Sequence, residues 1–332
     1  MASSGPYASL SLDLDNQWSY MRTHGDAGWD SYPSYLHVVL PLALDVVESA
    51  GLKMTVFLVG EDARQEQHHE LFRQIPRRGH EVGNHSQNHL QWLHKLPHAE
   101  LEKEILDADR FIEQACGHKP RGFRGPGFAC STTLLRILAQ HGYDYDCSTF
   151  PTFVGPLARA YYFMSARKLS DEESDERKDL FGSVRDGLRP LSGYLWDLQQ
   201  RDAQGRPIAD LLEIPVTTLP VLRTPIHMSY LLFLALRSPW LMRRYLDTAM
   251  TLCQLRGVEP SFLLHPLDFI SGTECQALRF FPAMNMPSEL KRELVFEVLT
   301  KLSRRFQVVP MGQHAAALRQ RQLPRRSPDL GQ

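Results

Sequence analysis

The sequence predicts an α/β fold, with a parallel sheet or a single-domain (β/α) barrel as its architecture. Three observations support this fold class. Short apolar runs typical of strands alternate with amphipathic helical patterns along most of the 332 residues. Polar residues suited to catalysis directly follow several of these runs, as they do at the catalytic end of such barrels. The chain is also 43% hydrophobic, which suffices for one large core.

The individual elements follow from local patterns. Residues 7–14 alternate polar and apolar side chains, as a strand does, and residues 35–50 carry apolar residues at helical spacing before Gly51. A second strand is predicted at 53–60 and a polar helix at 61–78. Further strands are predicted at 80–86, 143–147, 211–217, 261–265 and 306–311, and further helices near 98–115, 131–141, 240–256 and 287–304.

Three regions depart from this alternation. Residues 152–208 lack a clear period, so we expect an insertion that packs over a barrel domain spanning residues 1–315. Residues 227–237 (HMSYLLFLALR) are too short to span a bilayer. They predict a buried helix, with an interfacial face for a lipid-linked substrate as the alternative. Residues 316–332 are predicted to form a flexible C-terminal tail.

Composition limits the classes of partner and the compartment. The net charge is −1 and the pI about 6.9, so no overall charge attracts nucleic acid or an anionic membrane. The five cysteines are scattered without a CxxC pair, which suits a reducing compartment. The first residues resemble no signal peptide, and no long uncharged apolar stretch predicts a transmembrane segment. We therefore expect a cytoplasmic protein; its oligomeric state is not indicated.

A pair of histidines is the first candidate for metal binding. His85 and His89 are spaced i and i+4, which on a helical turn directs both rings to one side. This spacing alone is weak, and His94 and His98 repeat it with Pro97 between them, where we expect a surface loop. The first pair stands out because it directly follows a strand-like run.

Two carboxylates end the first strand. Asp13 and Asp15 are two residues apart and therefore lie on the same face of that strand. Neighbouring carboxylates repel each other unless a cation or solvent compensates them. Two histidines and one carboxylate that leave an open position for water are what a catalytic zinc site requires.

Four motifs in order give the chain a family resemblance. They are Asp-x-Asp at 13–15, HSQNH at 85–89, RGPGF at 124–128 and LLHPLD at 263–268. With them the sequence resembles the polysaccharide deacetylase family, also called the NodB-homology or carbohydrate esterase type. The resemblance covers roughly residues 8–150 and 205–310, and it implies a distorted (β/α) barrel, for which we expect about seven strands. In the usual first motif the aspartates are adjacent, whereas here Leu14 separates them, as in relatives that resemble lipid-linked aminosugar deformylases and certain peptidoglycan deacetylases.

The resemblance implies a role for each motif residue. Asp15, His85 and His89 would hold a divalent metal, with Zn²⁺ as the first expectation. Asp13 would be the general base, oriented by Arg124, and His265 the general acid. Assigning base and ligand between Asp13 and Asp15 depends on the inserted Leu14. General chemistry agrees, because a metal polarises an amide carbonyl, a carboxylate takes a proton from water, and hydrolysis needs an acid for the departing amine.

Other residues near the motifs are candidates for substrate binding. We expect Asp268 to hydrogen-bond His265, and Asp146 and Ser148 to line the pocket. Aromatic stacking on sugar is a hypothesis for Trp18, with core packing as the alternative. The full set of substrate-binding candidates is Pro126, Gly127, Phe128, Trp18, Asp146, Ser148 and Asp268.

The resulting functional hypothesis is a metal-dependent hydrolase that removes an acetyl or formyl group from an N-acylated sugar or polysaccharide. One alternative is a deformylase or amidase that acts on a lipid-linked or small substrate, with contact to a membrane surface. Another is a catalytically silent barrel that binds glycans, which the complete set of chemical residues disfavours. We also expect the insertion at 152–208, with Tyr161, Tyr162 and Phe163, to roof the site and favour a small or terminal acyl sugar.

Overall fold

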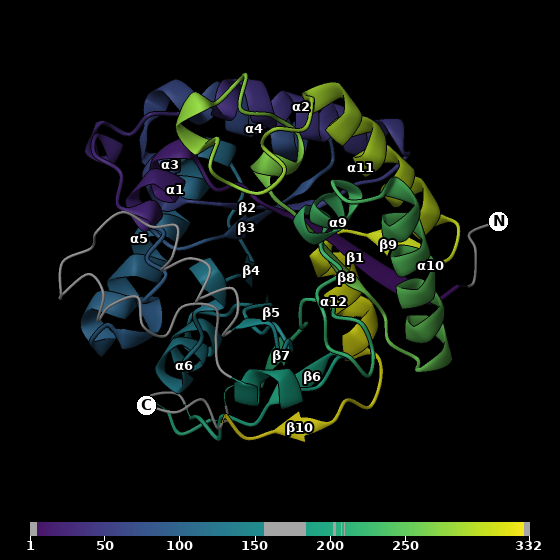
Figure 1. Ribbon diagram of the computed structural model, residues 1–332. Helices are drawn as coiled ribbons and strands as arrows, with labels where there is room; N and C mark the ends of the chain where they lie inside the picture. The colour runs from purple at the N-terminus through teal and green to yellow at the C-terminus, as the bar shows by residue number, and fades with distance from the viewer. Residues whose placement is uncertain (1–4, 156–183, 202–203, 207, 209, 329–332) are drawn as a thin grey trace.

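A curved parallel sheet forms the centre of the molecule. In the computed structural model, residues 5–155, 184–201, 204–206, 208 and 210–328 are described. Seven parallel strands follow one another in the spatial order β7-β5-β4-β3-β2-β1-β8. They are β1 (Tyr7–Asp13), β2 (Thr55–Leu58), β3 (Glu81–Asn84), β4 (Gly122–Phe123), β5 (Tyr145–Asp146), β7 (Leu211–Glu213) and β8 (Ser261–Leu264). Helices surround this sheet (Figure 1), which confirms the predicted distorted (β/α) barrel.

Three further strands extend the sheet. The strand β9 (Gln307–Val309) pairs with the start of β1. The strand β6 (Tyr194–Trp196) runs antiparallel to β7, and β10 (Arg325–Arg326) pairs with β6. The region 152–208, expected to be an insertion over the barrel, thus contributes a sheet strand in its described part. The segment 316–332, expected to be a flexible tail, contains β10.

Most helices follow the predicted ranges, whereas the first and the last, α1 and α12, were not predicted. The described helices are α1 (Gln17–His24), α2 (Leu36–Ser49), α3 (Gly60–Arg64), α4 (His69–Arg77), α5 (His98–Cys116), α6 (Thr132–Gln140), α9 (Met228–Ala235), α10 (Pro239–Leu255), α11 (Ser288–Ser303) and α12 (Met311–Arg319). The polar helix expected at 61–78 is interrupted, because Gln65 has extended backbone angles and ends α3. A short 3-10 turn, η2 (Glu66–His68), then leads into α4.

The side chains of β1 alternate between two environments. Ala8, Leu10 and Leu12 belong to the large core between the sheet and its outer helices. The intervening residues face the barrel interior, where Ser11 and Asp13 both contact Arg124. A period of two therefore gives this strand one apolar face for the core and one polar face for the site.

The helix α12 covers the amino-terminal ends of the strands. The backbone N–H of Met311 donates to Thr55 Oγ1 at 2.7 Å, and that of Gly312 donates to Glu81 Oε2 at 2.8 Å. Thr55 and Glu81 are the first residues of β2 and β3. Because α12 covers this end of the barrel, a site can open at the opposite end, where the strands finish.

The apolar stretch at 227–237 forms α9, as expected. Met228, Leu231, Leu232 and Ala235 are buried, whereas Phe233 and Leu236 are exposed, so the helix is amphipathic and not wholly internal. Among the helices that the structure describes, none is both long and apolar enough to cross a membrane. All five cysteines are free thiols.

Candidate active site

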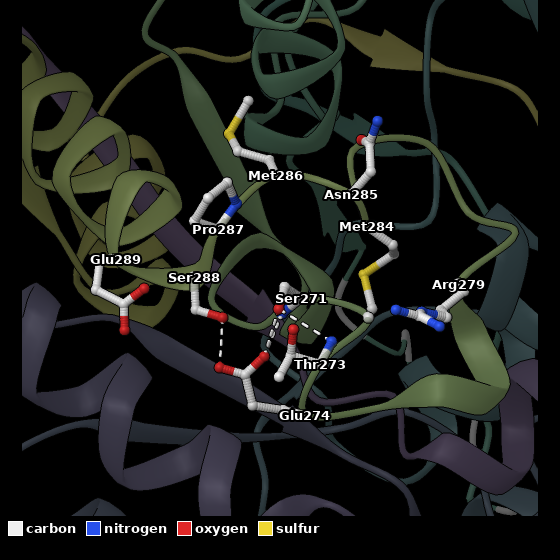
Figure 2. Close-up of a pocket in the computed structure, with 11 residues that line it drawn as sticks. Ser271, Thr273, Glu274, Arg279, Met284, Asn285, Met286, Pro287, Ser288 and Glu289 are labelled. Carbon is white, nitrogen blue, oxygen red and sulfur yellow. Dashed lines mark hydrogen bonds between the residues drawn. The ribbon is translucent and has the colours of Figure 1, made fainter.

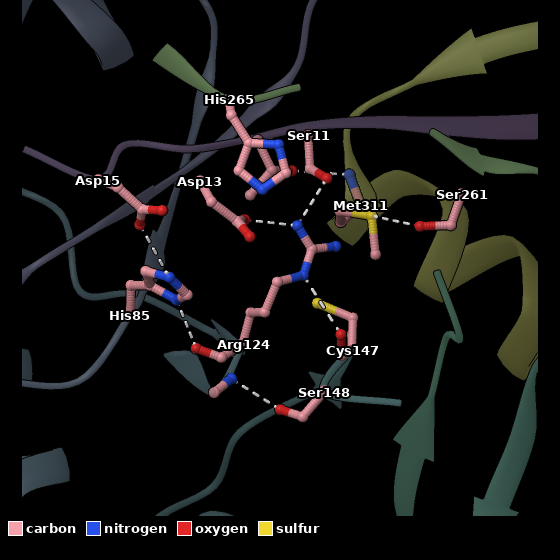
Figure 3. A network of polar contacts seen from close by, with 12 residues as sticks. Ser11, Asp13, Asp15, His85, Arg124, Cys147, Ser148, Ser261, His265 and Met311 are labelled. Carbon is pink, nitrogen blue, oxygen red and sulfur yellow. Dashed lines mark hydrogen bonds and ion pairs between the residues drawn. The ribbon is translucent and has the colours of Figure 1, made fainter. Parts of the chain in front are cut away.

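Strand register brings the predicted site residues together at the carboxyl ends of the strands. Asp13 pairs with Phe57 of β2, and its preceding residue Leu12 pairs with Leu264, directly before His265. On the other side, Asn84 pairs with Phe123, so the residues that follow them, His85 and Arg124, are neighbours. Figure 3 shows Asp13, Asp15, His85, Arg124 and His265 arranged around one space.

The histidine pair is held by a loop and not by a helical turn. Ser86 and His89 have positive φ angles of 63° and 50°, which a helix does not allow. The Asn84 side chain accepts a hydrogen bond from the Ser86 N–H at 2.7 Å, and Glu104 of α5 accepts one from the Asn88 N–H at 3.0 Å. The i and i+4 spacing therefore pointed to two histidines that do lie together, but a loop brings their rings together, not the expected helical turn.

Asp15, His85 and His89 form a cluster that fits a metal ion. Asp15 Oδ1 lies 2.9 Å from His89 Nε2 and 3.2 Å from His85 Nε2. One ligand atom from each residue lies within 4.8 Å of the others, and all three side chains are buried. Apart from these mutual contacts, no other described residue bonds Asp15 Oδ1 or either ring nitrogen of His89. Asp15 Oδ1 and the two Nε2 atoms converge on one point, and a divalent cation there would satisfy all three.

The ring of His85 is oriented by the backbone. Its Nδ1 lies 2.6 Å from the carbonyl oxygen of Arg124, so an Nδ1–H donated there leaves Nε2 free to face Asp15. Burial opposes ionisation of Asp15, yet the nearby His89 and His85 hold the pKa of this carboxyl well below its usual range. The cluster thus keeps an anionic oxygen ligand next to two imidazoles.

Asp13 and Arg124 make a buried ion pair beside this cluster. Arg124 Nη1 donates to Asp13 Oδ1 at 2.6 Å and to Ser11 Oγ at 2.9 Å, while Nε donates to the Cys147 carbonyl at 3.2 Å. The guanidinium also lies 4.6 Å from the Phe57 ring centre. Burial alone would lower the pKa of Arg124, but the Asp13 carboxylate raises it above the ordinary value. Asp13 Oδ2 receives no hydrogen bond from any described residue and remains available to a ligand.

His265 follows β8 and its ring contacts α9. Ser229 Oγ lies 3.1 Å from His265 Nδ1, a contact that was not predicted. Asp268 does hydrogen-bond His265, as expected, but its carboxylate accepts from the His265 backbone N–H at 2.8 Å and not from the ring. Asp268 therefore fixes the turn η6 (Pro266–Asp268) and acts on His265 through the backbone.

A buried lysine supports the same turn from α11. Lys291 is fully buried, and its Nζ donates to the carbonyls of Leu267 and Ile270, each at 2.7 Å. Burial lowers the pKa of Lys291 to about 8, although Asp268 and Glu274 act in the opposite direction.

The RGPGF motif contributes to an aromatic row beside the site. Pro126, Gly127 and Phe128 form the turn η4 (Pro126–Phe128), in which Pro126 is buried and Gly127 has φ 59°. The Phe128 ring lies 4.8 Å from the Phe150 ring, and Phe150 lies 5.8 Å from His227. His227 in turn lies 5.8 Å from His265. This row, Phe128–Phe150–His227–His265, is a candidate wall for a sugar ring, and its two middle members were not predicted.

Asp146 and Ser148 support the RGPGF loop from behind. Ser148 Oγ donates to Asp146 Oδ1 at 2.6 Å and accepts from the Gly125 N–H at 2.8 Å. Both side chains are buried, so we find them positioned to hold the loop and not to line a pocket. Glu213 is the register partner of Asp146, and burial followed by the charge of Asp146 raises the pKa of Glu213 well above its usual value.

Trp18 does not offer a stacking surface. It is 1% exposed, and its Nε1 donates to Asp62 Oδ1 at 2.9 Å. The same oxygen accepts from Asn16 at 2.7 Å. Trp18 is therefore a core residue that helps to fix the segment immediately after Asp15.

A separate surface hollow lies between the loop after β8 and the start of α11 (Figure 2). Its cavity is about 560 Å³ and is lined by residues 271–274, Arg279 and 284–289. Glu274 accepts hydrogen bonds inside it from the N–H and hydroxyl of Ser271. None of Asp13, Asp15, His85, His89 or His265 lines this hollow, so it is distinct from the metal-binding cluster.

Comparison with known proteins finds similarity to the same family over part of the chain. Residues 26–145 match the model of the polysaccharide deacetylase family. A peptidoglycan-N-acetylglucosamine deacetylase of Bacillus cereus is 31% identical over 139 residues, which are 42% of this chain and 61% of that protein. A chitooligosaccharide deacetylase of Sinorhizobium fredii is 30% identical over 134 residues, 38% of this chain and 61% of that protein. The chain thus spans about three fifths of the length of these relatives.

Solved structures share the fold at low identity. A Mycobacterium smegmatis protein assigned to the polysaccharide deacetylases superposes with a TM-score of 0.58 at 17% identity, covering 98% of this chain and 95% of that one. An allantoinase gives a TM-score of 0.54 at 14% identity over 95% of this chain and 91% of its own. The fold alone therefore does not fix the substrate. The matched segment carries His85, His89 and Arg124, and the sheet brings Asp13, Asp15 and His265 to them. Over residues 26–145 the chain is similar to the polysaccharide deacetylase family, and its fold is that of the solved structures named above.

Proposed function

We propose that this protein is a metal-dependent hydrolase that removes the acyl group, acetyl or formyl, from an N-acylated amino sugar. The observation that carries the proposal is the position of the Asp13–Arg124 ion pair next to the Asp15–His85–His89 cluster, at the end of the barrel where His265 also lies. The names of the curated relatives, deacetylases of peptidoglycan and chitooligosaccharide, support an N-acetylated glycan as the substrate.

Asp15, His85 and His89 would hold a divalent metal, for which Zn²⁺ suits the imidazole-rich donor set, although such sets also accept other first-row metals. When bound, the metal would polarise the acyl carbonyl and lower the pKa of a water molecule. The residues of the chain would carry out the proton transfers around that chemistry.

Asp13 would accept the proton of the attacking water. Arg124 occupies Oδ1, which fixes the plane of the carboxylate and leaves Oδ2 for the incoming proton. His265 would donate a proton to the departing amine nitrogen. If its Nδ1 engages the Ser229 hydroxyl, its Nε2 is the atom that faces the substrate.

The aromatic row Phe128–Phe150–His227–His265 would place the sugar. Burial, followed by the charge of His265, lowers the pKa of His227 to about 3, so His227 is neutral near pH 7 and serves as a polar aromatic surface. A flat apolar wall beside a polar cluster suits a sugar ring, whose C–H face packs on aromatic side chains while its amide faces the catalytic groups.

Release of acetate or formate tests the proposal. Purified protein supplied with Zn²⁺ should release acid from N-acetyl or N-formyl glucosamine oligomers, and His265→Ala should slow release by a factor of roughly 10² to 10⁴. Ser229→Ala should have a smaller effect, because it only orients the ring. If the wild-type protein releases neither acid from any N-acyl sugar, or if His265→Ala is fully active, the proposal fails.

A further inference from the structure

The helices α9 and α10 meet at an exposed corner that combines large apolar and basic side chains. We define this corner surface as Phe233, Leu236, Arg237, Trp240, Leu241 and Arg244. Trp240 is 67% exposed, and Phe233, Leu236 and Leu241 are each about 40% exposed. The two helices pack against each other and are joined by a connection of three residues, Leu236 to Ser238. All six side chains belong to the short stretch 233–244 that includes this connection.

The corner surface is basic because its arginines are not neutralised. No ion pair or hydrogen bond of the Arg237 or Arg244 side chain is made within the described residues, and both are exposed. The neighbouring acids are engaged elsewhere: Glu297 bonds Arg243 at 2.7 Å, and Asp247 bonds Lys301 at 3.0 Å. Two uncompensated guanidinium groups therefore stand beside an exposed Trp and three other apolar side chains.

A second apolar element adjoins this corner. The turn that carries Val221 and Leu222, which are 65% and 64% exposed, is attached to α10 by a 2.7 Å hydrogen bond between Thr224 and Tyr245. Tyr245 also contacts Tyr230 of α9, with ring centres 5.7 Å apart. The exposed apolar tip thus lies next to the same pair of helices.

We propose that the corner surface docks on a lipid bilayer that carries anionic headgroups. Trp and other large apolar side chains combined with Arg are the composition that binds such an interface, because the rings enter the headgroup region while the guanidinium groups pair with phosphate. A stable protein dimer buries about 20 to 30 residues on each side, far more than this surface offers. Its positive charge also fits an anionic surface better than a second copy of itself.

The corner surface is connected to the active site by α9. Ser229, in the first turn of α9, contacts the ring of His265, and Leu236 lies seven residues further along the chain. At 1.5 Å per helical residue this is roughly 10 Å. A docked molecule would therefore hold its active site close to the membrane surface. This last step rests on the proposed function and deepens it: the acyl sugar would be carried by a lipid.

Vesicle flotation with the full chain tests the docking. Wild-type protein should float with phosphatidylcholine vesicles that contain phosphatidylglycerol, and much less with phosphatidylcholine alone. The pair Arg237→Ser and Arg244→Ser should reduce binding by roughly 25-fold, since each basic residue contributes about fivefold near an anionic surface. The pair Trp240→Ser and Leu241→Ser should reduce binding to both kinds of vesicle.

A matched control lies on the same helix. Leu255, which is 75% exposed, and Arg256 lie at the far end of α10, and Leu255→Ser with Arg256→Ser should bind vesicles as the wild type does. Vesicle binding without loss in the corner variants, or no binding by the wild type, overturns the proposal. Sedimentation that shows a dimer lost in the corner variants, with no vesicle binding, would assign the surface to a second copy and also overturn it. Binding is measured without substrate, so failure of the proposed hydrolase activity would be seen separately.

Discussion

Arg124 links the two halves of the active site. Its guanidinium holds the Asp13 carboxylate at 2.6 Å, and its own backbone carbonyl accepts the Nδ1 hydrogen bond that orients His85. One residue therefore aligns the expected base and one expected metal ligand. The sequence assigned the first role through the family resemblance, whereas the second involves only a backbone atom and could not be read from residue types.

Replacing Arg124 should show how much the Arg124–Asp13 ion pair contributes to the free energy of unfolding. Because Arg124→Met leaves a buried carboxylate without its partner, we expect it to lower the free energy of unfolding by about 3–5 kcal/mol. The double variant with Asp13→Asn should be less destabilised than the sum of the two single changes. Chemical denaturation of all four proteins measures this. Strict additivity would mean that the two residues do not interact in solution.

The two aspartates should separate by their effects on metal and on catalysis. Asp13→Asn should retain the metal while kcat falls by a factor of roughly 10² to 10⁴, because the amide cannot take a proton. Asp15→Asn should instead weaken metal binding, since Asp15 Oδ1 lies beside both histidines. Elemental analysis together with acid release distinguishes these outcomes. Reversed results would mean that the base and ligand assignments are exchanged.

Several residue roles depended on geometry that the sequence does not contain. Trp18 was a stacking candidate by position, but its hydrogen bond to Asp62 turns the ring inward. Asp146 and Ser148 were expected in the pocket and instead hold the Gly125 N–H from behind. Each lies next to a motif in sequence, and only side-chain direction separates contact with the substrate from support of a loop.

At the scale of elements, the turns and loops that follow the strands set the positions of the site residues. The strands and long helices were predictable because their apolar periodicity is strong. The two-residue strand β4 was missed, since Gly122 and Phe123 are too few to show a pattern, and β6 lies in a region without a period. The HSQNH loop was mistaken for a helical turn because side-chain hydrogen bonds to its backbone replace the helical ones.

Lys291, which holds the turn after β8, should make the stability of the protein depend on pH. In the folded protein the pKa of Lys291 is lowered to about 8 from an ordinary 10.5. Between these values the unfolded chain binds one more proton than the folded chain, so this group makes stability rise with pH. We expect the unfolding free energy of the wild type, relative to Lys291→Met, to increase by about 2 kcal/mol from pH 8 to pH 10. A constant difference, measured by denaturation at both pH values, would show that Lys291 is charged in the folded state throughout.

At the scale of the whole molecule, we propose that the region 152–208 limits which glycans can approach. Tyr161, Tyr162 and Phe163, which we expected to roof the site, lie outside the described residues. A test must spare β6, because Trp196 donates to Glu213 at 3.0 Å and this strand is part of the sheet. Deleting residues 160–180 alone should increase activity on long N-acetylated polymers relative to short oligomers. Efficient internal deacetylation of a long polymer by the intact chain would contradict the roof.

The central claim is that one metal ion at Asp15, His85 and His89 supports hydrolysis of an N-acyl sugar. The most direct test measures metal content and acid release on the same samples of wild type, His85→Ala and His98→Ala, the last being an exposed histidine at the start of α5. We predict about one equivalent of metal and full activity in the wild type and in His98→Ala, and loss of both in His85→Ala. Chelation should abolish wild-type activity, and added Zn²⁺ should restore it. Full metal occupancy in His85→Ala, or undiminished acid release from metal-free wild type, would contradict the claim.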